Sequence, residues 1–340
     1  MNKKNRVTSY DVAHAAGVSQ SAVSRVYRPG VSVSKKTREK VLKAAEELGY
    51  KPNAIARMLI NQSTGMIAVI ISSRANVNFP EVLAQLNKHI AEKNKRVLLF
   101  TLDDAEQLET VIEQILAYQV DGVVALTAHF EPDSVTQFAK HNIPVVLYNR
   151  ELPDHSVSSV CCNHDQGLRM LVDILVNHHH QHFLIMAGPK DSDVARARLS
   201  GARNALLYHG FTDTNVVYGD YSYDSARECL SAYAEKNALP TAIICANDTM
   251  AIGAIDEIRE NLNLRVPEDI SVVGFDGISA SSWHSYQLTT VSQPTYFMTK
   301  AAVETLVNLI ESPDIPPETR YWPGKLIEGK SVAAAPRDNE

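Results

Sequence analysis

Polar side chains follow several apolar runs of this chain, at the points where strands would end. Asn149 and Arg150 come after one run, Asn247 after a second and Asp276 after a third. Amide, carboxylate and guanidinium groups of this kind can each pair with two neighbouring hydroxyl groups. When several lie at one edge of a sheet, they predict a pocket for a polyhydroxyl ligand such as a sugar.

Two further residues extend this set. Arg198 begins the sequence R-L-S-G near a predicted helix start, and Tyr221 lies in G-D-Y-S-Y-D. An aromatic face can cover the apolar side of a sugar ring. For each residue taken alone, a helix cap or a strand-end hydrogen bond is the more ordinary role. The set as a whole favours a binding pocket.

Apolar runs that alternate with helical segments must position these side chains. The predicted strands are Met66–Ser72, Arg96–Thr101, Gly122–Leu126, Pro144–Tyr148, Val157–Cys162, Phe183–Ala187, Ala242–Ala246 and Ile270–Gly274. The predicted helices include Glu81–Lys93, Asp104–Tyr118, Gln166–Asn177 and Ala195–His209. Such alternation is typical of parallel sheets wrapped by helices, where ligands bind at the carboxyl ends of strands. This stretch of about 275 residues exceeds one compact core, so we expect two α/β subdomains.

The first sixty residues differ in charge from the rest of the chain. They hold 12 Lys and Arg against 4 acidic residues, a formal charge of +8, whereas the whole chain carries −6. Residues 61–340 therefore carry −14. A phosphate backbone attracts the first part and repels the second, which places a nucleic-acid contact at the N-terminus.

The same segment opens with the pattern of a helix followed by a tight turn. Thr8 is placed to cap a first helix that runs to about Ala16, with Asp11 as its capping-box partner. Gly17 follows, and glycine adopts the left-handed backbone of such a turn at low cost. These features predict the first half of a helix-turn-helix.

A second helix is expected from about residue 20 to 27, capped by Ser19, with Val23 and Val26 turned inward. Its outer face carries Gln20, Ser21, Ala22, Ser24 and Arg25. Short polar side chains at a helix start, with a cation one turn on, fit a helix that reads base edges in the major groove. The alternative is a small helical domain with a solvated basic face.

A third helix is expected after Ser34, which is placed to cap it. The helix should run to about Leu48, because Gly49 marks its end. The apolar periodicity predicts burial through Val41, Leu42, Ala45 and Leu48.

Residues 50–61 form a moderately apolar helical stretch where a linker should be polar. A helix this short is marginal in water, so we expect it to fold when packed against DNA and a partner copy. Leu59 would then wedge into a minor-groove base step and kink the duplex. The alternative is a linker helix docked on the larger domain.

Three stretches together resemble the lactose-repressor/galactose-repressor (LacI/GalR) family of bacterial transcription regulators. They are T-S-Y-D-V-A-H-A-A-G-V-S-Q-S-A-V-S-R-V, V-S-V-S-K-K-T-R-E-K-V and Y-K-P-N-A-I-A-R-M-L. The resemblance runs over essentially the whole chain and is most specific in the first sixty residues. It implies that Gln20 and Ser21 are base-reading positions and that Leu59 intercalates at the operator centre. Arg28 departs from the family, which usually has Asn there.

The resemblance completes the set of expected contacts. The expected DNA contacts are Thr8, Ser19, Gln20, Ser21, Ala22, Ser24, Arg25, Arg28, Ser34, Thr37, Asn53, Ala56, Arg57 and Leu59. The expected effector contacts are Asn78, Phe79, Asn149, Arg150, Arg198, Tyr221, Asn247 and Asp276.

The fold implied by the resemblance is α/β. An N-terminal helix-turn-helix three-helix domain (residues 1–49) and a hinge helix (50–61) join a bilobed periplasmic-binding-protein-like domain (62–340) of two parallel-sheet α/β subdomains. Its N-lobe comprises about 62–162 and 292–322, and its C-lobe about 163–291 and 323–340. The chain would cross between lobes near Cys162–His164, Val291–Gln293 and Trp322–Lys325.

Two other features resemble reactive or metal sites. The run from His178 to His182 contains four histidines but has no cysteine or acidic cluster beside it, so we expect no metal there. The four cysteines show no C-x-x-C spacing, and no phosphate loop, nucleophile elbow or zinc-hydrolase motif is present. We therefore expect no cofactor, and free thiols.

The sequence thus predicts a DNA-binding repressor that acts as a homodimer on a pseudo-palindromic double-stranded operator. We expect a small molecule, a sugar, to control its affinity for this operator. The alternatives are a nucleoside or purine corepressor as the controlling ligand, or a sugar-metabolising α/β enzyme, for which no motif is present. With no signal peptide or transmembrane run, we expect a cytoplasmic location and no membrane partner.

Overall fold

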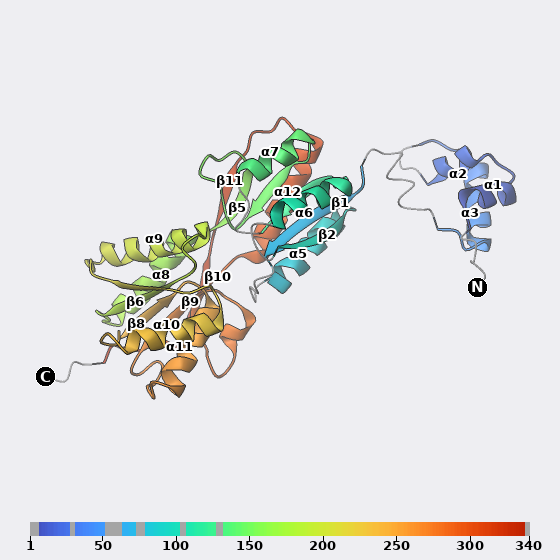
Figure 1. Ribbon diagram of the computed structural model, residues 1–340. Helices are drawn as coiled ribbons and strands as arrows, with labels where there is room; N and C mark the ends of the chain where they lie inside the picture. The colour runs from blue at the N-terminus through green and yellow to red at the C-terminus, as the bar shows by residue number, and fades with distance from the viewer. Residues whose placement is uncertain are drawn as a thin grey trace. The chain divides into compact units, whose positions relative to one another are not determined.

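The computed structural model describes residues 7–27, 31–51, 63–72, 79–102, 107–126 and 132–336, and its elements are drawn in Figure 1. The chain divides into two compact units, Met1–Thr64 and Gly65–Glu340. Among the described helices, none is both long and apolar enough to cross a bilayer.

The N-terminal unit contains helices α1 (Ser9–Ala16), α2 (Gln20–Val26) and α3 (Lys35–Glu47). The predicted caps are confirmed. The Thr8 hydroxyl accepts from the Asp11 N–H at 3.4 Å, and the Asp11 carboxylate accepts from the Thr8 N–H at 2.8 Å. The hydroxyls of Ser19 and Ser34 each accept a backbone N–H at 3.2 Å. Gly17 has φ +64°, the left-handed turn expected of it.

The core of this unit gathers one face of each helix, with Val12, Val23 and Val41 almost completely buried. The prediction that Leu42 and Leu48 are buried is wrong, since they are 44% and 39% exposed. The face of α3 toward α1 and α2 consists of Val41, Ala44 and Ala45. Leu42 lies one helical step round from that face, and Leu48 lies past the last helical residue.

The first sheet of the larger unit has the strand order β11-β5-β4-β3-β1-β2, and all its strands are parallel. Its strands are β1 (Met66–Ser72), β2 (Arg96–Leu102), β3 (Gly122–Ala125), β4 (Val145–Tyr148), β5 (Ser158–Asn163) and β11 (Thr319–Pro323). The helices that belong to it are α5 (Phe79–Glu92), α6 (Leu108–Ala117), α7 (Pro132–Lys140) and α12 (Thr295–Glu311). We call this part the first lobe.

The second sheet has the order β12-β10-β9-β8-β6-β7, and only β12 runs antiparallel, beside β10. Its strands are β6 (Phe183–Ala187), β7 (Asn215–Tyr218), β8 (Ala242–Cys245), β9 (Ser271–Asp276), β10 (Thr289–Ser292) and β12 (Lys325–Ile327). Its helices are α8 (His164–Asn177), α9 (Asp193–Tyr208), α10 (Tyr223–Ala234), α11 (Asp248–Glu260) and the 3-10 turn η2 (Ser279–Ser282). We call this part the second lobe.

Strand side chains alternate between two helical layers in each lobe. In β6, Phe183 and Ile185 join a core with α8 and α9, whereas Leu184 and Met186 join a core with α10 and α11. Figure 1 shows these two helix pairs on opposite sides of the sheet. Because helices cover both faces of each sheet, most strands are continuous apolar runs, and such runs could be identified in the sequence.

The α/β fold with a helix-turn-helix unit is confirmed. Each of the eight predicted strands is present: Met66–Ser72 and Phe183–Ala187 have the predicted bounds, and the ends of the other six differ by one or two residues. Four strands were not predicted: β7, β10, β11 and β12. The chain passes from the first sheet to the second after Asn163, returns after Ser292, and passes again after Pro323.

Candidate ligand pocket and DNA-binding surface

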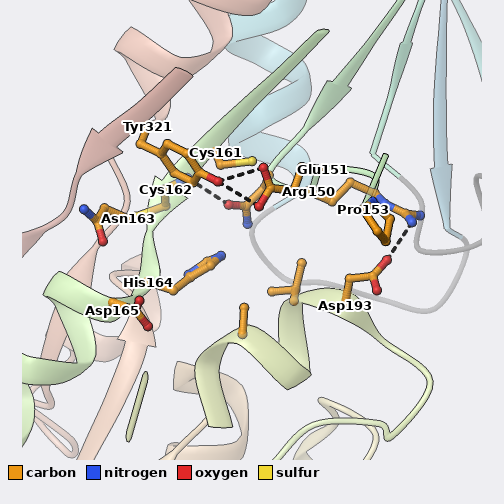
Figure 2. A pocket seen from close by; sticks show the side chains of 13 residues that line it. Arg150, Glu151, Pro153, Cys161, Cys162, Asn163, His164, Asp165, Asp193 and Tyr321 are labelled. Atoms are coloured by element: carbon orange, nitrogen blue, oxygen red, sulfur yellow. Dashed lines mark hydrogen bonds and ion pairs between the residues drawn. The ribbon is translucent and has the colours of Figure 1, made fainter. Parts of the chain in front are cut away.

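A pocket of about 320 Å³ lies between the two lobes, and its side chains are drawn in Figure 2. The first lobe supplies the ends of β4 and β5 and part of β11, and the second lobe supplies the starts of α8 and α9. The lining residues are Asn149, Arg150, Glu151, Pro153, Cys161, Cys162, Asn163, His164, Asp165, Asp193, Val194, Ala197 and Tyr321. The carboxyl edge of a parallel sheet thus faces two helix N-termini.

Two of the predicted effector residues, Asn149 and Arg150, line this pocket. Asn149 has φ +59°, a conformation that asparagine tolerates better than most residues. Its side-chain oxygen accepts from the Cys162 N–H at 3.3 Å, and its own N–H donates to Val160 at 2.7 Å. These bonds tie the end of β4 to β5 and fix the point from which Arg150 extends.

Arg198 and Asp276 lie behind the lining residues, where they form a buried ion pair. Arg198 Nη2 is 2.6 Å from Asp276 Oδ1, and the two side chains are 4% and 3% exposed. Arg198 Nη1 donates to the Ala246 carbonyl at 2.6 Å, and Gln293 donates to the same Asp276 oxygen at 2.6 Å. The pair therefore joins α9 to the ends of β8 and β9.

This pair reaches the pocket through His164. Arg198 Nε lies 3.5 Å from His164 Nδ1, and the His164 ring lines the pocket. Burial, and then the adjacent Arg198 cation, hold the pKa of His164 well below its usual value. The pocket wall thus carries a neutral imidazole at neutral pH.

Asn247 and Tyr221 are also placed beside each other rather than among the lining residues. The Asn247 side chain caps α11 by accepting from the Met250 N–H at 2.9 Å, and it donates to the Tyr221 carbonyl at 3.2 Å. Tyr221 has φ +72° and packs its ring against Gly188, where a Cβ would lie 2.5 Å from the ring. Asn247 thus has the capping role that was its ordinary alternative, and its contact with a ligand stays a prediction, as does that of Tyr221.

Phe79 begins α5 and packs against the core that extends through both lobes. Asn78 lies outside the described residues. The structure therefore brings Asn149 and Arg150 to the pocket, and Arg198 and Asp276 to a network behind it.

An ion pair connects the lobes across the pocket. Arg150 Nη2 of the first lobe lies 2.7 Å from Asp193 Oδ2 at the start of α9 in the second, as Figure 2 shows. Arg150 is 4% exposed and Asp193 is 31% exposed. On the first-lobe wall, the Tyr321 hydroxyl donates to the Glu151 carboxylate, 2.7 Å from both oxygens.

Sequence reasoning missed the second-lobe wall, which contains none of the predicted effector residues. His164 and Asp193 begin α8 and α9, each two residues before the helix start predicted from the sequence. Tyr321 lies on β11, which has no apolar run to mark it, because its burial pattern is mostly exposed. Glu151 was adjacent to the predicted Asn149 and Arg150 and was findable from that position alone.

The predicted base-reading side chains lie at the start of α2. Ser21 and Arg25 are exposed, and Gln20, Ala22 and Ser24 are partly exposed. The Ser21 hydroxyl lies 2.9 Å from that of Ser19, and Arg25 Nε donates to the Ser21 carbonyl at 3.3 Å. Short side chains around a helix start leave room for a duplex edge.

The other expected DNA contacts divide into two groups. Thr8, Ser19, Ser34 and Thr37 lie at the capped starts of helices, where backbone N–H groups favour a phosphate. Arg28, Asn53, Ala56, Arg57 and Leu59 lie outside the described residues, as do residues 52–61 of the expected hinge helix.

The histidine run has a structural role. The buried His180 ring lies 3.0 Å from the Thr241 hydroxyl, the Ser271 hydroxyl and the Ala333 carbonyl, and so ties the C-terminal segment to the second sheet. Burial lowers the pKa of His180. Among the described residues, no group of three His, Cys, Asp or Glu side chains is arranged to hold a metal ion. The four cysteines are free.

Comparison with known proteins agrees with this architecture. The model of the lacI family of bacterial regulatory proteins matches residues 8–53, and that of a periplasmic binding protein-like domain matches residues 172–332. The HTH-type transcriptional regulator AscG of Escherichia coli (strain K12) is 31% identical over 337 residues, covering 97% of this chain and 99% of AscG.

Two solved structures are also similar over nearly the whole chain. The lac repressor dimer bound to operator and the anti-inducer ONPF has a TM-score of 0.88 at 31% identity, covering 97% of this chain and 100% of the repressor chain. The complex of the transcriptional regulator CelR with cellobiose has a TM-score of 0.74 at 29% identity, covering 96% of this chain and 100% of CelR. From its full-length similarity to AscG and its match to the family model, this chain belongs to the lacI family of bacterial regulatory proteins.

Proposed function

We propose that this chain is a transcriptional repressor that binds a pseudo-palindromic operator as a homodimer. A sugar in the pocket between the lobes weakens or strengthens its binding to the operator. As a member of its family, it is a DNA-binding regulator and not an enzyme. The similar lac repressor was solved as a dimer bound to its operator, which supports the proposed DNA binding as a dimer. The similar regulator CelR was solved with cellobiose, which supports a sugar as the ligand. We place it in the cytoplasm, where its DNA lies.

The observation that carries the proposal is the composition of the pocket wall. Asn149, Arg150 and Tyr321 come from the first lobe, whereas His164 and Asp193 come from the second. A ligand that contacts both sides stabilises one arrangement of the lobes over another. Its binding energy can therefore bias the arrangement that a dimer presents to DNA, with a coupling of about 1–3 kcal/mol.

The ligand is identified by screening the full chain for thermal stabilisation by uncharged sugars, sugar phosphates and nucleosides, since a ligand of the folded state raises the melting temperature. A compound that stabilises the chain is then titrated into the operator complex. We expect a sugar to change operator affinity by about 5–150-fold. If a nucleoside or purine changes operator affinity instead, the proposed sugar effector is wrong and that compound takes its place. If no stabilising compound changes operator affinity, effector control is contradicted.

The DNA-reading surface is tested by randomising Gln20 and Ser21 and selecting for operator binding. We expect altered base preference, because these side chains lie at the start of α2. Recovery of one unchanged preferred site from every selected pair would contradict base reading by α2.

Arg25 is expected to contribute a charge contact as well. Arg25→Ala should reduce the slope of log affinity against log salt by about one if this cation meets a phosphate. The matched control is Arg203→Ala, an exposed arginine of the larger unit, which should leave the slope unchanged.

The hinge is proposed to fold on DNA and to insert Leu59 into a base step. Leu59→Ala should then reduce specific binding more than non-specific binding, because only the specific complex contains the kink. Equal losses on both kinds of DNA, with unchanged bending, would count against insertion.

A further inference from the structure

The pocket supplies a counter-ion to its own buried arginine. Arg150 Nη2 lies 2.7 Å from Asp193 Oδ2, and Arg150 is almost completely buried at the lobe boundary. A guanidinium recognises carboxylates and phosphates through such N–H groups. Asp193 therefore occupies a position on Arg150 that the acidic group of a ligand would otherwise take.

The other charges of the wall add to this effect. The lining residues include one arginine and three carboxylates, those of Glu151, Asp165 and Asp193. His164 stays neutral because burial and Arg198 lower its pKa. The wall is thus formally negative, so an anionic ligand entering it meets repulsion as well as an occupied arginine.

The arginine behind the wall is matched in the same way. Arg198 pairs with Asp276 at 2.6 Å, with both side chains buried. Arg196, which also contacts Asp193, is 58% exposed, so solvent and salt screen its charge. Neither buried guanidinium of the site is left to attract an anion.

We propose that Asp193 sets the charge specificity of this pocket: by neutralising Arg150 it restricts the site to uncharged polyhydroxyl ligands and excludes sugar phosphates and sugar acids. The proposal rests on the proposed function in taking the ligand to be a sugar. The pairing of Asp193 with Arg150, on which the proposal is based, does not depend on which sugar binds.

Asp193→Asn in the full chain removes the carboxylate and keeps the size of the side chain. The hydroxyl of Ser192 still caps α9, so the helix start is preserved. With this carboxylate removed, Arg150 should bind inorganic phosphate and glucose 6-phosphate at least about tenfold more tightly than in the native chain, as measured by calorimetry. Glucose binding should change much less.

Two variants separate this effect from a general change of charge. Asp191→Asn alters the net charge equally but lies outside the pocket lining, and it should gain no phosphate affinity. The double variant Arg150→Gln, Asp193→Asn should lose the gain in phosphate affinity, because the exposed Arg196 alone binds phosphate weakly. A native chain that binds phosphate as tightly as Asp193→Asn would overturn the proposal.

An equal gain in Asp191→Asn, or a gain that persists without Arg150, would also overturn it. The proposed function fails in a different way. A phosphate gain that depends on Asp193 and Arg150, in a chain that binds no sugar at all, would support the counter-ion assignment while contradicting the sugar.

Discussion

The N-terminal unit and the pocket of the larger unit use arginine in opposite ways. In α2, Arg25 is exposed, and its Nε donates to the backbone carbonyl of Ser21 in the same helix. Arg150 in the pocket wall and Arg198 behind it are buried, and each is paired with a carboxylate. Exposed cations attract a polyanion over a distance, whereas buried, paired cations orient neighbours and add little net attraction. We therefore propose that the same residue type serves DNA binding in one unit and ligand selection in the other.

The largest expected effect comes from removing one side of this comparison. Deleting residues 1–64 should abolish operator binding, because the positive charge and α2 are lost, and should leave ligand binding intact. Operator binding is measured by fluorescence anisotropy and ligand binding by calorimetry. Specific operator binding by the remaining Gly65–Glu340 unit would show that DNA binding is not confined to the positively charged N-terminal unit.

Arg198→Ala should have the next largest effect, on the stability of the larger unit. It leaves the buried Asp276 carboxylate without its partner, and breaking such a pair costs about 3–5 kcal/mol. Urea unfolding measures the loss. Arg196→Ala, which removes an exposed arginine two residues away, should cost no more than about 1 kcal/mol. Similar costs for the two variants would contradict a special role of the buried pair.

The buried carboxylate Asp248 should give the larger unit a pH dependence of its own. Burial, and then the neighbouring Asp276, raise the pKa of Asp248 from 3.8 to about 7. Because the folded state binds this proton more tightly, the stabilisation is full below pH 3.8 and is lost as the pH rises through 7.

Asp248→Asn keeps the group neutral at every pH. Its free energy of unfolding, relative to that of the native chain, should therefore rise between pH 4 and 7, whatever constant offset follows from altered bonds to Thr290 and Ile278. Denaturation at a series of pH values tests this expectation. Parallel pH profiles for the two proteins would rule out Asp248 as the titrating group.

The smallest effect is expected in the N-terminal unit. Ser19→Ala removes the side-chain cap of α2 and should destabilise this unit by about 1 kcal/mol, measured by thermal unfolding. Ser24→Ala, a change of the same size within the helix, is its control. A larger loss from Ser24→Ala would indicate that local capping does not hold α2 in place.

Local interactions explain what the sequence predicted well. The caps at Thr8, Ser19 and Ser34 join residues three apart, so their patterns are complete within a few letters. The buried parallel strands read as apolar runs for a similar reason. The failure at Leu42 is instructive, because helical periodicity identifies an apolar side chain but not the neighbour that must cover it.

The pocket depended on contacts between distant residues. Arg198 and Asp276 are 78 residues apart, and Arg150 and Asp193 are 43 apart, so no short pattern relates either pair. Reasoning from strand ends predicted that Asn149 and Arg150 line a pocket, and both do, whereas their contact with an effector stays a prediction. It could not tell that Arg198 and Asp276 satisfy each other behind the wall, since that depends on how α9 packs on the sheet.

Control of DNA affinity by a ligand in the pocket is tested by a linkage measurement. The ligand found by the sugar screen is titrated by calorimetry into the full chain alone and into the chain saturated with operator. We expect the two dissociation constants to differ by about 5–150-fold, and the ligand to shift operator affinity by the same factor. Equal dissociation constants in the two titrations would contradict it.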